Sequence, residues 1–435
     1  AFPRMIGANF MINGSGFHPD SLEGKYHFQF RELTFPDRTF LPWKLQVDIN
    51  RDFLSRERTI DIQSPIISGK VVGWFTLDDL IRESSSQGKI VAQFLQHKIP
   101  ILTASIGGAK LSAPDAPLDY LHARRPLDVR FDINVRDITP VNVLLGKDLT
   151  LDIKAGIHGA MKADSMQSLT ELNDITIENS RLIASGTTIQ SDKIQTSARV
   201  LLRHTGSLTE VSKLVLTTRC DSMLYIDDAV LYRPSVHLDY SSGQMALSAS
   251  GVLNNEISGA ISGTLNFRDS VVDFALDTLN VGFGGMKWQS YKISTGSFTH
   301  QGVQVSKLEM RRKNAERVEF KGLISDSHFK DFTVSLHEFP LRELTKFQFI
   351  DDDTKLLLKT LEGEATVLQI DLNGTYKKPI ISCTGQFDNL AYNGIAIGNQ
   401  TLNLRHQDSI ITGSLEITNP KVSGAPQVLR IGVEQ

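Results

Sequence analysis

Residues 367–418, VLQIDLNGTYKKPIISCTGQFDNLAYNGIAIGNQTLNLRHQDSIITGSLEIT, decide the fold class of this chain. Apolar residues at 368, 370 and 372 alternate with polar residues at 369, 371 and 373, and the alternation returns at 402–405. A period of two is typical of a β-strand with one face out of water, and Gly, Asn and Asp are typical of turns. The segment therefore predicts short strands, each with one apolar and one polar face.

The same alternation recurs along most of the 435 residues. Its clearest strand is VRFDINV at 129–135, and further alternating runs lie at 43–49, 236–240, 245–249, 272–276, 318–320 and 334–336. Short alternating strands separated by frequent turn signals indicate an antiparallel all-β structure. We therefore predict an all-β fold with a small helix content.

Two helical interruptions and a proline-rich stretch divide this pattern. At 76–97 apolar residues recur at helical spacing around the sequence SSSQG at 84–88, which predicts one or two short helices ending before Pro100. After the acidic run at 351–353, leucines at helical spacing predict a second interruption. The expected organisation is an N-terminal β segment at 1–107 ending in short helices, a Pro-rich connection at 108–127, a β repeat region at 128–340, a helical interruption at 341–362 and C-terminal β repeats at 363–435.

Composition and charge narrow the classes of partner. The net charge of -3 argues against a nucleic-acid partner, because such binding depends on neutralising phosphates. No apolar run approaches the roughly 18 residues of a membrane span, and no signal-peptide pattern opens the chain. The abrupt start at Ala1 and end at Gln435 suggest a piece of a longer protein. Cys220 and Cys383 are expected to be separate buried thiols.

Motifs for chemistry are absent from the sequence. The closest histidines are nine residues apart, so no short-spaced metal-ligand pair exists. No nucleotide-binding glycine loop and no G-x-S-x-G motif occur. The acidic run at 351–353 lacks the spaced oxygens of a calcium loop and is interpreted as a helix start. We expect no catalytic residues, no metal and no cofactor.

The alternating strands leave two ways of covering their apolar face. The sheet packs on a second sheet, as in a sandwich or barrel, or it curls around an apolar interior. Alternation alone does not distinguish these arrangements. An open interior of this kind must be occupied by something apolar, because a large exposed apolar patch marks a binding surface.

The chain resembles the TamB family of translocation and assembly module proteins, which belong with the AsmA-like proteins. The residues that carry the resemblance follow the family's repeat pattern at 339–344, 361–364, 372–379, 385–390 and 394–398. The same pattern also occurs earlier in the chain, at 14–17 and 68–80. The pattern is most similar to that of the Bacteroidota branch of the family. It implies an elongated curled sheet, the β-taco half-pipe, with an apolar interior. It also implies a periplasmic location within a protein anchored in the inner membrane outside this piece, and a BamA-like outer-membrane barrel protein as a partner.

The family's implied function is to move phospholipid between the inner and outer membranes along a hydrophobic groove, in support of outer-membrane biogenesis. The partners in the groove are then phospholipid acyl chains. We expect the groove to be lined by Phe131, Ile133, Val135, Leu151, Leu238, Leu247, Phe274, Leu276, Phe320, Leu336, Ile370, Leu372, Leu402 and Leu404. Two alternatives stay open: a secreted or surface structural, adhesive β-solenoid with a filled core, and a polysaccharide-active β-helix enzyme.

Overall fold

The computed structural model describes residues 5–16, 22–34, 39–40, 43–98, 125–137, 149–184, 187–205, 208–268, 271–299, 301–312, 315–325, 327–346, 352–407, 410–418 and 428–434. Its strands belong to one antiparallel sheet, so the all-β prediction is confirmed. Among the described strands none forms a second sheet on top of the first, so the sandwich arrangement is not observed. The chain divides into two compact units within strand β14 (Gln244–Leu253).

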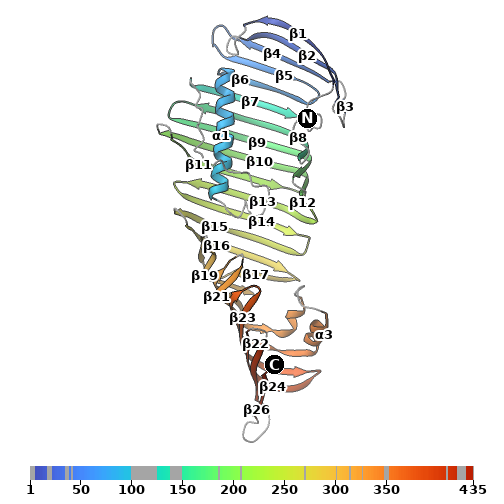
Figure 1. Cartoon of the computed structure of the whole chain (residues 1–435), viewed down its shortest axis with the longest axis vertical. Coiled ribbons are helices and arrows are strands. Elements are labelled where there is room, and N and C mark those ends of the chain that lie inside the picture. The colour runs from blue at the N-terminus through green and yellow to red at the C-terminus, as the bar shows by residue number, and fades with distance from the viewer. Residues whose placement is uncertain are drawn as a thin grey trace. The chain divides into compact units, whose positions relative to one another are not determined.

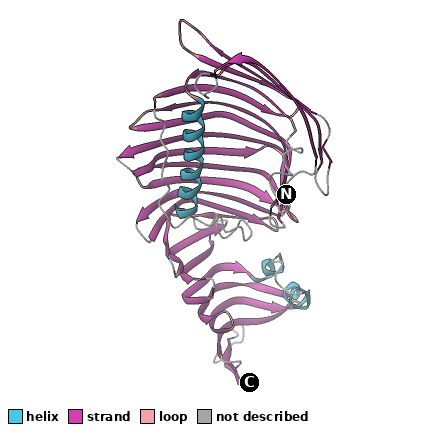
Figure 2. Cartoon of the chain, turned by 45° about the horizontal axis from the view of Figure 1, so that its top comes forward, coloured by secondary structure: helices cyan, strands magenta, loops and turns pink. Residues whose placement is uncertain are grey.

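The first unit is a meander in which most strands pair with strands close to them in sequence, although Ile67–Trp74 pairs with the more distant Leu127–Val135. Figure 2 shows its long strands bowed, as a curled sheet requires. Its strands are β1 (Met5–Ser15), β2 (Glu23–Thr34), β3 (Thr39–Phe40), β4 (Trp43–Arg51), β5 (Arg58–Gln63), β6 (Ile67–Trp74), β7 (Leu127–Val135), β8 (Leu149–Ala163), β9 (Gln167–Ala184), β10 (Thr187–Thr205), β11 (Leu208–Cys220), β12 (Met223–Ile226) and β13 (Ala229–Ser241).

The helix α1 (Leu77–Lys98) lies across the strands of this unit (Figure 1). Thr76 caps its start, because the hydroxyl of Thr76 accepts a hydrogen bond of 3.0 Å from the backbone N–H of Asp79. The helix ends before Pro100, as expected. It continues through residues 84–88, however, so the predicted break does not occur there. Buried contacts to the sheet, described below, hold this weak helical segment in place.

The second unit continues as a meander of strands and, among its described residues, carries two short helices. Its strands are β15 (Ile257–Arg268), β16 (Val271–Phe283), β17 (Met286–Ser290), β18 (Ser294–Thr299), β19 (Gly302–Arg312), β20 (Glu316–Ile324), β21 (His328–Pro340), β22 (Leu361–Thr375), β23 (Lys378–Tyr392), β24 (Ile395–Gln407), β25 (Ile410–Thr418) and β26 (Val428–Glu434). The 3-10 helix η3 (Leu341–Lys346) and α3 (Asp352–Thr360) are observed where the leucine pattern predicted a helical interruption.

The hairpin between β22 and β23 shows how the sequence sets its corners. Gly374 has a φ of 83°, a left-handed conformation that favours glycine, and its partner across the turn is Pro379. Lys378 at the start of β23 is paired with Thr375 at the end of β22. The turn therefore contains only Tyr376 and Lys377, in the region that the sequence marked as a breaker.

The buried core of the first unit lies on one face of its sheet. Val129 is fully buried and Leu127 is 3 % exposed, and they cluster with buried side chains of β2, β4, β5, β6 and β8. Leu77 and Leu80 of α1 pack against this cluster. Burial of a large aliphatic side chain contributes about 1.5–3 kcal/mol, so this cluster anchors the first turn of α1 to the sheet.

Candidate functional site

A row of side-chain positions on one face of the first unit joins two of the predicted groove residues. The pairing runs from Phe131 in β7 through Gly159, Leu172, Ala198 and Leu216 to Leu238 in β13. Paired residues in an antiparallel sheet project to the same face. Phe131 and Leu238 therefore lie in one row across six strands, although they are far apart in sequence.

Two further rows widen this face. Ile133 pairs with Ile157, which pairs with Ile175, and Val135 leads through Ala155 to Ile177. These isoleucines and Val135 are half-buried. We call the following set the first apolar face: Phe131, Ile133, Val135, Ile157, Leu172, Ile175, Ile177, Leu216 and Leu238.

The β8, β9 and β11 members of this face were not predicted from the sequence. A register shift between β8 and β9 occurs opposite His158 and Gly159, so Leu172 and Ile175 share a face although they are three residues apart. Leu151 lies in β8, but its side chain is outside the described part of the chain. Leu247 is half-buried in β14, two residues after the fully buried Met245.

Helix α1 covers the same face at the end of the strands that lies away from Val135. Beneath the helix, Leu202 is fully buried and Leu214 is 2 % exposed. Near the C-terminal end of α1, the ring of Phe94 contacts that of Tyr240 with centroids 4.6 Å apart. The helix thus covers the part of the face around Leu202 and Leu214, whereas the part around Ile133 and Ile175 is only half-buried.

Polar side chains dock the middle of α1. Ser168 in β9 donates a short hydrogen bond to the carboxylate of Glu83, and its oxygen lies 2.8 Å from Nε2 of His204 in β10. Thr170 donates another to Gln87, and the Gln87 amide donates to Glu83 over 2.9 Å. All five of these side chains are buried. The helical periodicity of apolar residues gave no sign of this network.

The helix is consequently oriented differently from the prediction. Ile81, expected on the apolar stripe, is 65 % exposed, whereas Glu83 is 1 % exposed. The grouping of Ser168, His204 and Glu83 is a docking contact rather than a nucleophile site, since the Ser168 hydroxyl is fully buried. The carboxylate of Glu83 contacts Ser168, and Nδ1 of His204 lies 3.1 Å from the hydroxyl of Thr209.

A second apolar face occupies one side of the second unit. The pairing runs from Phe320 through Val334, Ile370 and Cys383 to Leu404 in β24. The other predicted groove residues of this unit project to the same side, as their pairings and strand alternation show. The second apolar face comprises Phe274, Leu276, Phe320, Val334, Leu336, Ile370, Leu372, Cys383, Leu402 and Leu404.

Most side chains of the second apolar face are half-buried, with Phe274 at 8 % exposed as the exception. Cys383 lies between Ile370 and Leu404, and burial raises the pKa of its thiol, with a smaller contribution from Asp371. The raised pKa disfavours the reactive thiolate at neutral pH. Cys220 and Cys383 are both free thiols, and Cys220 is buried as expected, whereas Cys383 is only half-buried.

One edge of the second face is closed around a buried arginine. Arg312 forms an ion pair with Glu316 and a second of 2.7 Å with Glu343 of η3, and its guanidinium lies 5.4 Å from the ring centroid of Trp288. Trp288 in turn stacks on Phe339, which is 1 % exposed. Burial alone would lower the pKa of Arg312, but the hydrogen bonds to Glu316 and Glu343 raise it.

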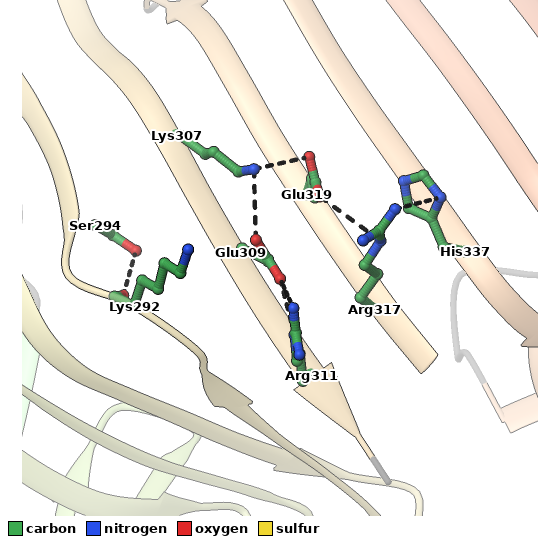
Figure 3. A network of polar contacts seen from close by, with 8 residues as sticks. All are labelled: Lys292, Ser294, Lys307, Glu309, Arg311, Arg317, Glu319 and His337. Atoms are coloured by element: carbon green, nitrogen blue, oxygen red, sulfur yellow. Dashed lines mark hydrogen bonds and ion pairs between the residues drawn. The ribbon is translucent and has the colours of Figure 1, made fainter. Parts of the chain in front are cut away.

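The opposite face of the second unit is charged (Figure 3). Glu309 and Glu319 are paired residues on β19 and β20, and Lys307 lies within 3.4 Å and 3.5 Å of their carboxylates. Arg311 donates to Glu309 over 2.8 Å, and Arg317 approaches both Glu319 and His337. The sheet therefore has one apolar and one ionic side, as the alternation predicted.

No chemical centre accompanies these faces in the described residues. Within the described ranges no group of three His, Cys, Asp or Glu side chains could hold a metal ion. Over the same residues, the helices are too short or too polar to span a bilayer. Comparisons of the chain with protein-family models, with curated proteins and with solved structures found no match.

Proposed function

We propose that the two apolar faces bind the acyl chains of lipids and that the chain forms part of a bridge-like carrier moving phospholipid between the inner and outer membranes. The observation that supports the proposal is that residues such as Ile133, Ile175 and Leu402 are only half-buried on a single-layered sheet. A sheet face of this kind requires an apolar occupant, because exposed apolar patches of this extent mark binding surfaces.

Acyl chains fit the character of these faces. Each buried methylene group contributes about 0.8 kcal/mol, so a chain of many methylenes gains a large total without any specific hydrogen bond. Rows such as Ile133, Ile157 and Ile175 repeat similar side chains at each strand spacing, about 4.8 Å. A lipid tail therefore meets a nearly uniform wall along the rows, which favours sliding over fixed binding.

The same proposal includes the location and the partners that the resemblance implies. The carrier would lie in the periplasm, within a protein anchored in the inner membrane by a segment outside this piece. It would act in outer-membrane biogenesis together with a BamA-like barrel protein. The polar faces, exemplified by the Lys307 and Glu309 network, suit contact with water on the other side of the sheet.

Lipid extraction and mass spectrometry of the purified protein test the proposal directly. We expect co-purified phospholipid, and we expect Leu402→Glu to reduce it severalfold. The matched control is Asn403→Glu, because Asn403 is the next residue of β24, is exposed and projects to the polar face. A photo-reactive amino acid at Ile133 should also form lipid adducts, whereas the same group at Asn403 should not.

The outcomes separate lipid carriage from the structural alternative. Protein that carries no lipid after mild purification, and that gives no adduct at Ile133, would contradict the proposal and favour a structural β-solenoid. Equal loss of lipid in Leu402→Glu and Asn403→Glu would also count against binding at the second apolar face. Circular dichroism of both variants establishes that each has kept its strands.

A further inference from the structure

A depression of about 1120 Å³ lies on the polar face of the first unit, on the side of the sheet away from the first apolar face. It is lined by residues of β1, β2, β4, β5, β6 and β7. A sheet face that serves only to meet water does not require such a hollow.

The lining is organised as a row across neighbouring strands. His27, Gln46, Gln63, Ser68 and Asn134 are successive partners on β2, β4, β5, β6 and β7. Strands are about 4.8 Å apart, so the row extends over about 19 Å. We call these five side chains the amide row, because three of the five are amides.

Each amide of the row is oriented by a carboxylate on its own strand. The side-chain nitrogen of Gln46 donates to Asp48 over 3.3 Å, that of Gln63 to Asp61 over 3.2 Å, and that of Asn134 to Asp132 over 3.3 Å. The same contact thus occurs on three strands that line one depression. A side chain held in this way loses less conformational freedom when a ligand binds, which favours affinity.

The charges around the row nearly balance. Lys44, Lys70 and Arg136 line the depression together with Asp61 and Asp132. A polyanion such as a nucleic acid would require a clear excess of positive charge. Elsewhere the polar face of this unit carries direct ion pairs, such as Arg199 with Glu171 at 3.1 Å, and Asp132 in the lining of the depression forms one with His158 at 3.2 Å.

Amide and hydroxyl side chains each offer both a donor and an acceptor. Sugar hydroxyl groups have the same dual character, and an oligosaccharide repeats them along its length. At one end of the row the exposed side chain of Met11, paired with His27, adds an apolar contact that suits the C–H groups of a sugar ring. We infer that the amide row binds an extended, uncharged oligosaccharide.

This binding site is independent of lipid carriage, since it lies on the opposite face of the sheet. The test is isothermal titration of the full chain with neutral oligosaccharides of increasing length, built from glucose or from N-acetylglucosamine. We expect affinity to rise with length until the row is filled. Gln63→Ala and Asn134→Ala should each weaken binding by about tenfold, as expected for one lost hydrogen-bonding group of about 1.4 kcal/mol.

The matched control is Gln369→Ala in β22 of the second unit. Gln369 also donates to a carboxylate two residues away, Asp371, at 3.0 Å, but it lies outside the depression. Gln63 and Asn134 are both exposed, so their substitution is not expected to unfold the sheet. Urea unfolding of all three variants checks this point.

Several outcomes would overturn the inference. These are absence of binding by the unchanged protein to any of the oligosaccharides, equal weakening by Gln369→Ala, and tighter binding of a polyanion or of an extended peptide than of any sugar. A change in lipid content in Gln63→Ala would show that the two faces are not independent, and would contradict the assignment of a separate site.

Discussion

Glycine and phenylalanine lie opposite each other on neighbouring strands at two positions of the apolar faces. Phe131 pairs with Gly159 in the first unit, and Phe274 pairs with Gly296 in the second. A Cβ atom added to Gly296 would lie 2.3 Å from the Phe274 ring. The missing side chain therefore makes the space that each aromatic ring fills, an arrangement known to stabilise glycines in sheets.

This packing predicts that Gly159→Ala destabilises the first unit. The added Cβ would lie 2.7 Å from Cζ of Phe131 and 2.6 Å from the backbone oxygen of Glu171, so the ring or the strand must shift. Overpacking of this kind costs about 1–3 kcal/mol. Urea unfolding followed by circular dichroism measures the loss.

Gly156→Ala on the same strand is the control. Its added Cβ would lie no closer than 3.4 Å to another atom, the side-chain oxygen of Asn134. We expect its free energy of unfolding to change by less than about 0.5 kcal/mol. Equal destabilisation by the two substitutions would show that the Phe131 ring is not held over Gly159.

At the scale of elements, α1 combines apolar ends with a polar middle. Leu77 and Leu80 pack on the sheet at its start and Phe94 contacts Tyr240 near its end, while Glu83 and Gln87 make the hydrogen bonds between. Buried hydrogen bonds add little net stability, but a buried group that loses its partner costs about 1–3 kcal/mol. The hydrogen bonds in the middle of α1 therefore specify where the helix lies on the sheet, while they contribute little to the net free energy of its packing.

Glu83→Ala should consequently destabilise the docking of α1. The change removes an acceptor from Ser168 and from the Gln87 amide, both of which are buried. We expect a loss of about 1–3 kcal/mol and faster amide hydrogen exchange along α1 than along β4 and β5. Ser84→Ala, at an exposed neighbouring position, should change neither quantity. Unchanged exchange in Glu83→Ala would indicate that the apolar ends alone hold the helix.

The elements also show which features the sequence could reveal. Alternation identified the strand at 129–135 and placed Phe131, Ile133 and Val135 on one face, because a strand's period is visible within seven residues. It did not reveal that Leu172 belongs with Phe131, since a bulge in β9 changes the local period. Nor could it reveal the amide row, whose five residues come together only through the register of five strands.

The inward side of α1 was missed for a different reason. A glutamate and a glutamine four residues apart on a helix ordinarily indicate a solvated face, and Ile81 ordinarily indicates a buried one. Only the position of Ser168, Thr170 and His204 on the sheet makes the polar side the buried side. That information is long-range, with more than 80 residues between Glu83 and its partner Ser168.

For the whole molecule, the direction of several pKa shifts predicts how stability depends on pH. Burial would raise the pKa of Glu309, but hydrogen bonds from Arg311 and Lys307 lower it. The pKa values of Asp52 and Asp164 are lowered by backbone N–H groups, that of Glu343 by Arg312 and Lys346 against the effect of burial, and that of His337 by burial and by Arg317.

All of these pKa shifts make the folded protein less stable as the pH falls. A carboxylate with a lowered folded-state pKa stabilises the fold above its unfolded pKa and loses that contribution as pH falls through the folded value. For His337 the neutral form is favoured in the fold, so its contribution also declines as pH falls. We therefore expect stability to decrease between about pH 7 and pH 3, most steeply below about pH 4.

Urea unfolding over this range, compared with Glu309→Gln, checks the prediction. The variant should be less stable at neutral pH and should show a weaker dependence on pH, because it has lost one of the coupled groups. Its control is Glu171→Gln, whose carboxylate forms a partly exposed ion pair with Arg199 at 3.1 Å. A protein that becomes more stable on acidification would contradict the assigned shifts.

The meander topology has a consequence for how the chain acquires its structure. In each unit most paired strands are close neighbours in sequence, so a newly formed strand usually finds its partner in the segment made just before it. The pair β6 and β7, which has α1 between its strands in sequence, is an exception. Such local pairing requires little loop closure and favours rapid folding. We expect the chain to fold progressively during synthesis, so that the strands of the first unit assemble while the ribosome is still translating the second.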